Sequence, residues 1–242
     1  MTPTGLQAIG ERAVEYVADG HVVGLGTGRA AAAFLEALAA QVRGGLRVRG
    51  VATSRASAEL AQRLQIPLVS LDEAPEIDAT IDGADEIDPH GNAIKGYGGA
   101  LVREKIVAAA SRRLVLLVGD EKLVPVLGSR GKLPVEVVPF GVAATARRLT
   151  NLGLVPALRM ADGKPFVSDN GNQILDCGTG PIPQPAELEA EICAIPGVVG
   201  TGLFLGLVDV VLIARGGQVE VRETGLTLSR KQTASGDIVK TR

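Results

Sequence analysis

The sequence contains few of the residues from which metal and redox sites are usually built. Only two of its 242 residues are cysteines, Cys177 and Cys193, and only two are histidines, His21 and His90. The spacing of these side chains matches no zinc or thiol redox motif, so a structural zinc site is not expected. We expect two free thiols in a reducing compartment, with a single disulfide as the less favoured alternative.

Aromatic residues, surplus charge and long apolar runs are also scarce. The chain has two tyrosines, four phenylalanines and no tryptophan, and 25 basic and 27 acidic side chains give a net charge of −2. This composition argues against the stacking platforms and basic footprints that bind nucleic acid. No apolar run approaches the roughly 20 residues that span a bilayer, and the N-terminus lacks a signal-peptide pattern. We therefore expect a cytoplasmic protein that binds neither nucleic acid nor membrane.

What the sequence does have is a regular alternation of helical and strand patterns in its first half. Helices are predicted at 5–18, 30–43, 55–65 and 100–111, and strands at 21–26, 47–53, 67–71, 78–82 and 114–119. This alternation is typical of an α/β fold with a doubly wound, mostly parallel sheet that helices cover on both faces.

The rhythm changes near residue 130, where antiparallel hairpins replace the alternation. The patterns predict strands at 133–140, 154–160, 165–169, 173–177 and 198–205, tight turns at Asp162-Gly163 and Asn170-Gly171, and helices at 142–152 and 186–195. The apolar segment 208–214 resembles the earlier strands and is expected to rejoin the first sheet.

These patterns divide the chain into three parts. We expect residues 1–129 and 206–221 to form a larger α/β domain, and residues 130–205 to form a smaller α+β domain inserted into it. Residues 222–242 are polar, with few apolar anchors, and are predicted to be a loosely ordered tail.

A glycine loop, 24-GLGTG-28, connects the first strand to the second helix. Backbone amides at such a helix start form an anion site. Arg29 stands where a dinucleotide fingerprint would continue, and no Gly-Lys-Ser/Thr follows, so a nucleotide is not indicated. The loop predicts a phosphate cradle, with a glycine turn that serves only packing as the alternative.

A group of carboxylates, 82-DGADEID-88, follows the predicted strand at 78–82. Ligands bind at the carboxyl ends of strands in open α/β sheets, which makes Asp82 and Asp85 candidate ligand contacts. A turn with capping aspartates is the alternative. The spacing does not match a calcium loop, so a metal site is disfavoured.

Lys95 precedes a second glycine cluster, and Glu104 follows in the first turns of the predicted helix. Helical periodicity places Val102, Ile106 and Ala109 on the buried stripe and Glu104 on the solvent-facing side. The closeness of Glu104 to Lys95 and to the aspartates nevertheless makes it a candidate general base acting on a carbon acid.

Three further cations lie near this segment. Arg103 and Lys105 are expected to be surface charges, whereas Lys122 follows the strand at 114–119 at its carboxyl end and is a candidate ligand contact.

Together these segments resemble the ribose-5-phosphate isomerase family of the A type. The resemblance is carried by 24-GLGTG-28, 53-TS-54, 82-DGADEID-88, 95-KGYGGALVREK-105, 133-LPVEVVPF-140, 168-SDNGNQILD-176 and 196-PGVVGTGLF-204. Any one of these loops is a weak signal, but seven in order are specific. The resemblance implies a doubly wound α/β domain with an inserted α+β domain that acts as a lid or in oligomerisation, and a homodimer or homotetramer.

The resemblance also implies an activity, the interconversion of D-ribose 5-phosphate and D-ribulose 5-phosphate through an enediolate in the non-oxidative pentose phosphate pathway, without metal or organic cofactor. Glu104 matches the proton-transferring base. Lys95 would stabilise the oxyanion, and Asp82 and Asp85 would hold sugar hydroxyls. The matching substrate loops are Thr27, Gly28, Arg29 and Ala30; Asp82, Gly83, Ala84 and Asp85; Lys95, Gly96, Tyr97 and Gly98; and Lys122.

The sequence departs from this family's pattern at three places. Arg29 and Ala30 replace two hydroxyl donors of the usual G-T-G-S-T loop, Tyr97 replaces a glycine, and Asp120 precedes Lys122 by two residues rather than three.

Two other functions fit the general fold. A sugar-phosphate-responsive repressor would need a helix-turn-helix segment, for which too few residues precede the first strand. A deaminating isomerase or a transferase with a glutamate nucleophile would use the same scaffold. The R-E-K and D-G-A-D segments favour the isomerase over both.

Overall fold

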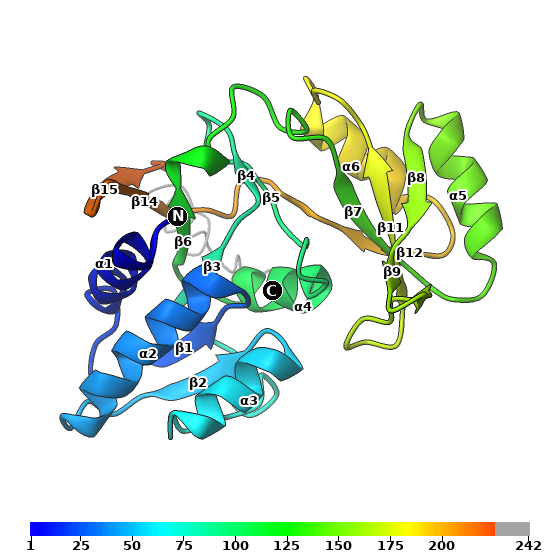
Figure 1. Cartoon of the computed structure of the whole chain (residues 1–242). Helices are drawn as coiled ribbons and strands as arrows, with labels where there is room; N and C mark the ends of the chain where they lie inside the picture. Colours follow the sequence, from blue (N-terminus) through cyan, green and yellow to red (C-terminus); the bar gives the residue numbers. More distant parts are fainter. Residues whose placement is uncertain (226–242) are drawn as a thin grey trace, which may run out of the picture.

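A six-stranded sheet forms the centre of the larger part of the protein (Figure 1); the computed structural model describes residues 1–225. Its strands are β1 (Val22–Leu25), β2 (Arg49–Ala52), β3 (Ala79–Gly83), β6 (Leu114–Gly119), β14 (Val210–Arg215) and β15 (Gln218–Glu223). They lie in the order β15-β14-β6-β3-β1-β2, and all neighbours pair in parallel except β14 and β15. The predicted doubly wound α/β sheet is confirmed, and the segment at 208–214 rejoins it as β14.

The strand order places a crevice between β1 and β3. From β1 the chain moves to β2 on one side, and then returns past β1 to β3 and onward to β6. The loops that follow β1 and β3 therefore turn away from each other at the carboxyl edge of the sheet, which is where ligands bind in such folds.

Helices cover both faces of this sheet. They are α1 (Pro3–Val14), α2 (Arg29–Arg43), α3 (Arg55–Arg63) and α4 (Leu101–Ala109). Side chains of β6 alternate between two apolar clusters, because successive residues of a strand point to opposite faces. Val115 and Leu117 pack with Phe34 of α2, whereas Leu116 packs with Ala108 of α4 on the other face.

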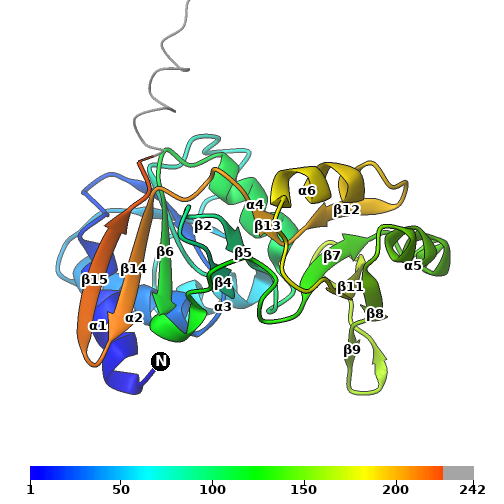
Figure 2. The ribbon, with the colours of Figure 1, turned by 90° about the horizontal axis from the view of Figure 1, so that it is seen from above.

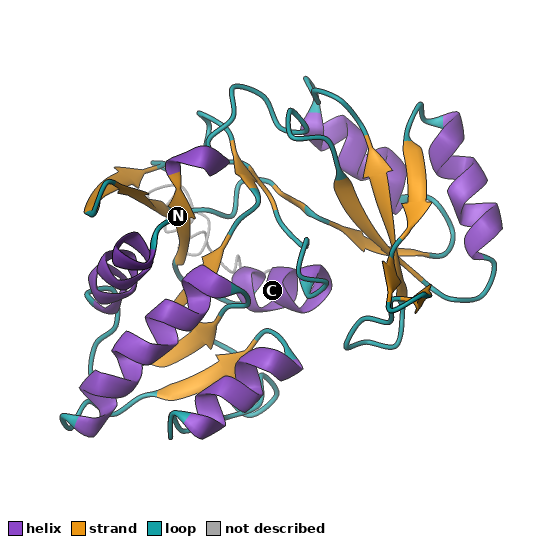
Figure 3. Cartoon of the chain, viewed as in Figure 1, coloured by secondary structure: helices purple, strands orange, loops and turns teal. Residues whose placement is uncertain are grey.

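The inserted α+β domain lies between β6 and β14 in the sequence and to one side of the central sheet in space (Figures 1 and 2). Its antiparallel sheet has the order β12-β7-β11-β8, formed by β7 (Leu133–Val137), β8 (Val155–Leu158), β11 (Gln173–Gly178) and β12 (Val198–Thr201). Helices α5 (Val142–Asn151) and α6 (Pro185–Cys193) accompany only this smaller sheet (Figure 3). Leu149 and Ile192 anchor these helices in a separate apolar core with Val135 of β7.

Several short elements lie outside the two main sheets. A three-stranded sheet consists of β4 (Glu86–Ile87), β5 (Ala93–Ile94) and β13 (Leu203–Phe204). A separate hairpin consists of β9 (Met160–Ala161) and β10 (Lys164–Pro165). A 3₁₀ turn spans Asp120–Lys122. The predicted strand at 198–205 is thus two strands in different sheets, β12 and β13. The break is at Gly202, where a Cβ would lie 2.2 Å from the carbonyl oxygen of Lys95.

Several other predictions need correction. The segment 67–71 is not a strand, since it contributes one bridge from Leu68 to Gly50. The first helix ends at Val14 rather than at 18, and the predicted strand at 165–169 is regular only at its start, although the turn at Asp162-Gly163 is confirmed. The strands β4, β5 and β15 are missing from the prediction. The first residues of the tail predicted at 222–242 belong to β15 instead. The part of this predicted tail from residue 226 onward lies outside the described residues. Across residues 1–225, no helix has the length and apolar character needed to cross a membrane.

Candidate active site

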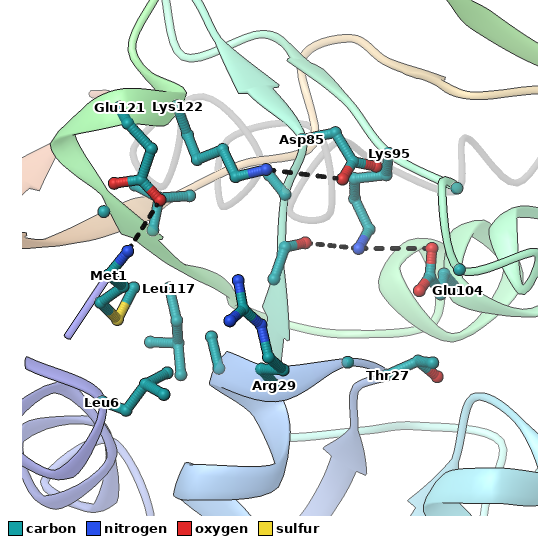
Figure 4. A pocket seen from close by; sticks show the side chains of 18 residues that line it. Met1, Leu6, Thr27, Arg29, Asp85, Lys95, Glu104, Leu117, Glu121 and Lys122 are labelled. Atoms are coloured by element: carbon teal, nitrogen blue, oxygen red, sulfur yellow. Dashed lines mark hydrogen bonds and ion pairs between the residues drawn. The ribbon is translucent and has the colours of Figure 1, made fainter. Parts of the chain in front are cut away.

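A cavity of about 250 Å³ opens at the carboxyl edge of the central sheet (Figure 4). It lies where the loops after β1, β3 and β6 meet the Lys95 loop and the first turn of α4. Most of the predicted contacts line it: Thr27, Gly28, Arg29, Ala30, Gly83, Ala84, Asp85, Lys95, Gly96, Gly98, Glu104 and Lys122. Sequence reasoning missed Met1, Leu6, Leu117, Val118, Gly119 and Glu121, which also line it. Of these, Leu117, Val118 and Gly119 are the last residues of the strand that made Lys122 a candidate, and Glu121 follows it.

The glycine loop after β1 lies directly against the end of β3. A Cβ at Gly26 would lie 2.4 Å from Oδ1 of Asp82, so only glycine allows this approach. The backbone N–H of Thr27 donates to the same oxygen over 3.0 Å. Gly28, with a φ of 99°, then begins α2 without a side-chain cap. The first amides of α2 are therefore open to an anion in the pocket.

One end of the pocket is cationic. Figure 4 shows Arg29 and Lys122 toward this end, and Lys95 with Glu104 toward the other. Arg29 is exposed at the start of α2, and the Nζ atom of Lys122 lies 4.0 Å from Oδ1 of Asp85. Two positive side chains beside a helix N-terminus suit a phosphate group.

Asp82 lies behind the pocket rather than on its lining, with 1% of its surface exposed. Its carboxylate accepts hydrogen bonds from the backbone N–H groups of Thr27 and Gly83 and pairs with Lys95 over 3.0 Å. Asp82 therefore fixes two loops and one cation, and Asp85 is the aspartate that the pocket reaches.

Lys95 is the cation at the inner end of the pocket, and its side chain is almost fully buried. Its Nζ atom donates to the carbonyl oxygen of Gly83 over 2.5 Å and lies 3.0 Å from Asp82 and 3.3 Å from Glu104. It also lies 5.4 Å from the centroid of the buried Phe204 ring. Burial alone would lower the pKa of Lys95, but the negative charges of Asp82 and Glu104 raise it to about 12. The ammonium group is therefore a fixed positive charge.

Glu104 is buried, with 4% of its surface exposed, which corrects the prediction that it faces solvent. The buried face of α4 consists of Leu101, Glu104, Val107 and Ala108, whereas Ile106 of the predicted stripe is 51% exposed. The physical reason is that this face of α4 meets the sheet edge and Lys95 rather than a uniformly apolar core. A helical pattern of apolar residues cannot reveal a carboxylate that is buried beside a cation.

The carboxylate of Glu104 has unusual surroundings. Within residues 1–225 its Oε2 atom has no hydrogen-bond partner, and it lies 3.3 Å from the ammonium group of Lys95. Burial raises the pKa of Glu104 to about 8, with Lys95 lowering it and Asp82 raising it further. A carboxyl group in this state can exchange a proton near neutral pH.

Asp85 and the Tyr97 backbone connect the two loops of the site. Oδ2 of Asp85 accepts a hydrogen bond of 3.0 Å from the N–H of Tyr97. The Tyr97 ring does not line the pocket; its hydroxyl donates to the carbonyl oxygen of Lys132, and burial raises its pKa to about 12. The Tyr97 side chain is thus directed away from the pocket. The loop can therefore hold a tyrosine at the position where the family pattern has a glycine.

A chain of hydroxyl groups supports Thr27 from behind. Its Oγ1 atom lies 2.8 Å from Oγ1 of Thr53 and 2.8 Å from Oγ of Ser54. Ser54 in turn caps α3 in a capping box with Ser57. The Thr53-Ser54 pair therefore contributes to the site by holding the side chain of Thr27 in place.

Arg103 and Lys105, the expected surface charges, do not line the pocket. Arg103 donates to the carbonyl oxygen of Asp169 and to Asn170, while Lys105 pairs with Glu189 over 2.8 Å. Both side chains connect α4 to the inserted domain.

The described residues hold no cluster of donors for a metal ion. Within residues 1–225, no group of three or more His, Cys, Asp or Glu side chains is placed to hold one.

Comparisons with known proteins agree on one family. Residues 49–218 match the family model of ribose 5-phosphate isomerase A, also called phosphoriboisomerase A. Ribose-5-phosphate isomerase A of Gloeobacter violaceus is 55% identical over 216 residues, which cover 89% of this chain and 94% of the relative.

Solved structures give the same result. The ribose 5-phosphate isomerase A of Methanocaldococcus jannaschii superposes with a TM-score of 0.87 at 39% identity, over 90% of this chain and 98% of the other. A D-ribose-5-phosphate isomerase in complex with phospho-erythronic acid gives a TM-score of 0.88 at 36% identity, over 92% and 100% of the two chains.

Proposed function

The chain belongs to the ribose 5-phosphate isomerase A family, and we propose that the pocket at the carboxyl edge of its central sheet is the active site. The protein is an aldose–ketose isomerase that interconverts D-ribose 5-phosphate and D-ribulose 5-phosphate. One observation carries the assignment of the site. Glu104 is a buried carboxylate with a pKa raised to about 8, and it faces the pocket beside the fixed charge of Lys95.

In this proposal Glu104 moves the proton. In the open-chain aldose, the ionised carboxylate removes the proton from C2. The electrons of the C–H bond form the C1–C2 double bond, and the oxygen on C1 takes the negative charge. Glu104 then returns the proton to C1, while the hydroxyl on C2 loses its proton and becomes the ketone. A proton moves from the oxygen on C2 to the oxygen on C1, so atoms and charge balance.

Lys95 and the loop amides stabilise the enediolate. The ammonium group lies 3.3 Å from Glu104, so the oxygen on C1, next to the carbon that Glu104 deprotonates, comes close to this charge. Preorganised positive charge in a site with little water is an effective way to stabilise an oxyanion. The relative that binds phospho-erythronic acid is consistent with such a site, since the carboxylate of that ligand has the negative charge that an enediolate develops.

The phosphate group binds at the opposite end. We assign it to the amides of Thr27–Ala30 with Arg29 and Lys122, and we assign the sugar hydroxyls to Asp85 and the Gly83–Ala84 backbone. Asp82, which is buried, acts through Thr27 and Lys95 rather than on the sugar. Binding energy from the phosphate, remote from the reacting carbons, orients the sugar for proton transfer.

The remaining assignments extend this proposal. We place the domain boundaries at 1–129 with 206–221 and at 130–205, with the smaller domain serving as a lid or in oligomerisation. We also propose a homo-oligomer, a dimer or tetramer, and a cytoplasmic location. The close contacts between α4 and the inserted domain through Arg103 and Lys105 support a lid that touches the site.

The test is an activity measurement with chelator present. Wild type should convert ribose 5-phosphate to ribulose 5-phosphate without added metal, and Glu104→Gln should lose at least about 10²-fold in kcat, the low end for a positioned base. The matched control is Glu191→Gln, since Glu191 is exposed on α6 and should be silent. Full activity of Glu104→Gln would remove the assignment of the base, and dependence on metal would contradict the mechanism.

A further inference from the structure

Arg159 of the inserted domain reaches into the loop between Lys95 and Glu104. It lies between β8 and β9, and its Nη1 atom donates to the carbonyl oxygens of Gly96 over 3.0 Å and of Tyr97 over 3.1 Å. These are two successive carbonyl groups of the loop that follows Lys95. Arg159 does not line the pocket, so it contacts the site only from behind.

The guanidinium group of Arg159 is itself held in place. Its Nε atom donates to Oδ2 of Asp176 over 3.0 Å, and its Nη2 atom donates to Oδ1 of the same residue. The Phe166 ring lies 5.7 Å away, and only 10% of the Arg159 side chain is exposed. A bidentate pair of this kind fixes the plane of the guanidinium group, which a lysine cannot do.

The two hydrogen bonds that Arg159 donates to carbonyl oxygens determine where the N–H groups of this loop point. The described chain has no cis peptide bonds, and in a trans peptide the N–H points opposite to the C=O. The Gly96–Tyr97 peptide is therefore held from both sides, because its C=O accepts from Arg159 and its N–H donates to Asp85 over 3.0 Å. In the next peptide, the C=O of Tyr97 also accepts from Arg159, which directs the N–H of Gly98 away from Arg159. Gly98 lines the pocket.

We propose that Arg159, fixed by Asp176, is a positioning residue for the isomerisation, which orients the amides of the loop after Lys95 toward the enediolate and toward Asp85. The inference rests on the proposed function of this site. It gives the inserted domain a part in catalysis that no residue of the pocket lining reveals.

Loss of Arg159 should affect kcat more than KM. The phosphate end of the pocket is built from the α2 start and Lys122, which Arg159 does not contact, so ground-state binding should change little. The loop amides and Lys95 act on charge that develops in the transition state, and small misplacements there reduce the rate strongly. We expect Arg159→Met to lower kcat by about 10- to 100-fold, with a change in KM of less than about threefold.

The experiment compares Arg159→Met, Asp176→Asn and the double variant with wild type. Arg148→Met is the matched control, since Arg148 is an exposed arginine of the same domain. If Asp176 acts through Arg159, the double variant should lose no more kcat than Arg159→Met alone. Hydrogen exchange should accelerate in the segment 93–104 in Arg159→Met and remain unchanged in the control.

Three results would overturn the inference. They are a kcat within about twofold of wild type in folded Arg159→Met, additive losses in the double variant, or unchanged exchange in 93–104. Should Arg159→Met fail to fold, Arg159→Lys takes its place, because it keeps the charge but cannot form the fork and should still lose kcat. Failure of this inference leaves wild-type isomerase activity and the defect of Glu104→Gln intact, so the two proposals are tested separately.

Discussion

Two buried glutamates, one in each part of the molecule, differ in the groups that surround them. Glu136 of β7 in the inserted domain is fully buried, and its Oε1 atom accepts hydrogen bonds from Ser168, Asn170 and Asn172 at 2.9–3.0 Å. Glu104 of α4 is buried almost as completely, and its Oε2 atom lies 3.3 Å from the ammonium group of Lys95. Among residues 1–225, the Oε2 atoms of both glutamates have no hydrogen-bond partner, so the two carboxylates differ in the three neutral donors on Oε1 of Glu136 and in the cation beside Glu104. The residue type and the burial are the same, and the partners differ.

We propose that this difference separates a structural carboxylate from a reactive one. Three neutral donors converge on Glu136 and thereby fix the turn at 168–172, whose Asp169 and Asn170 contact Arg103 of α4. Among the residues that the structure describes, Glu104 has no such set of donors; it faces a cavity, and burial raises its pKa to about 8. If Glu104 is the base, as we propose, burial alone does not mark the catalytic group, whereas burial beside a cation on a cavity wall does.

The largest expected effect comes from removing the reactive carboxylate. Glu104→Gln should lower kcat by at least about 10²-fold, because a positioned base contributes that much or more. Glu136→Gln, measured in parallel with folded protein, should retain most of its kcat. Equal losses in the two variants would abolish the distinction between them.

Replacement of the cation beside Glu104 should have the next largest effect. Lys95→Met should lower kcat by about 10²-fold, since it removes the charge that stabilises the oxyanion. Lys95 lowers the pKa of Glu104, so the rise of kcat/KM with pH should also move to higher pH in this variant. Lys105→Met is the matched control, because Lys105 lies at the same distance of 5.4 Å from the Phe204 ring but outside the pocket. A shift of the pH profile to lower values would contradict the assigned pairing.

The structural carboxylate should matter for stability instead. Glu136→Gln weakens hydrogen bonds to a charged acceptor, and the free energy of unfolding should fall by about 1–3 kcal/mol. Urea unfolding would measure this difference against wild type, and Glu191→Gln would serve as the silent control. A variant as stable as wild type would show that the three donors on Glu136 contribute little.

The smallest effect is expected at the phosphate end. Arg29→Ala should raise KM for ribose 5-phosphate by about tenfold with little change in kcat, since Arg29 is exposed and solvent weakens its interaction with phosphate. Arg43→Ala, at the other end of α2, is the control because Arg43 is also exposed. An unchanged KM would assign the phosphate to Lys122 and the helix amides alone.

The sequence predicted the central sheet and most residues of the pocket lining because both depend on local patterns. Strands and their following loops are recognisable in sequence, and in a doubly wound sheet the loops after β1, β3 and β6 must meet at one edge. The sequence alone therefore indicates that Thr27, Asp85 and Lys122 lie at one edge of the sheet, and all three line the pocket.

The sequence could not predict contacts that depend on the inserted domain or on a buried charge. Periodicity placed Glu104 on the solvent side of α4, because such patterns assume that buried faces are apolar. Arg159 lies 63 residues from Gly96 in the sequence, and no local pattern connects them. Functional sites are where local rules fail most often, since reactive groups are kept in surroundings that stability alone would not select.

The central claim is that Glu104 is the base and that its surroundings raise its pKa. The direct test is an infrared difference titration of the Glu104 carboxyl group, wild type minus Glu104→Gln, alongside the pH dependence of kcat/KM. A base must be ionised to act, so activity should rise with pH, and the rise and the carboxyl titration should both centre near pH 8. The account would be contradicted if Glu104 were already ionised at about pH 5, as expected for a carboxyl group with the ordinary pKa of glutamate.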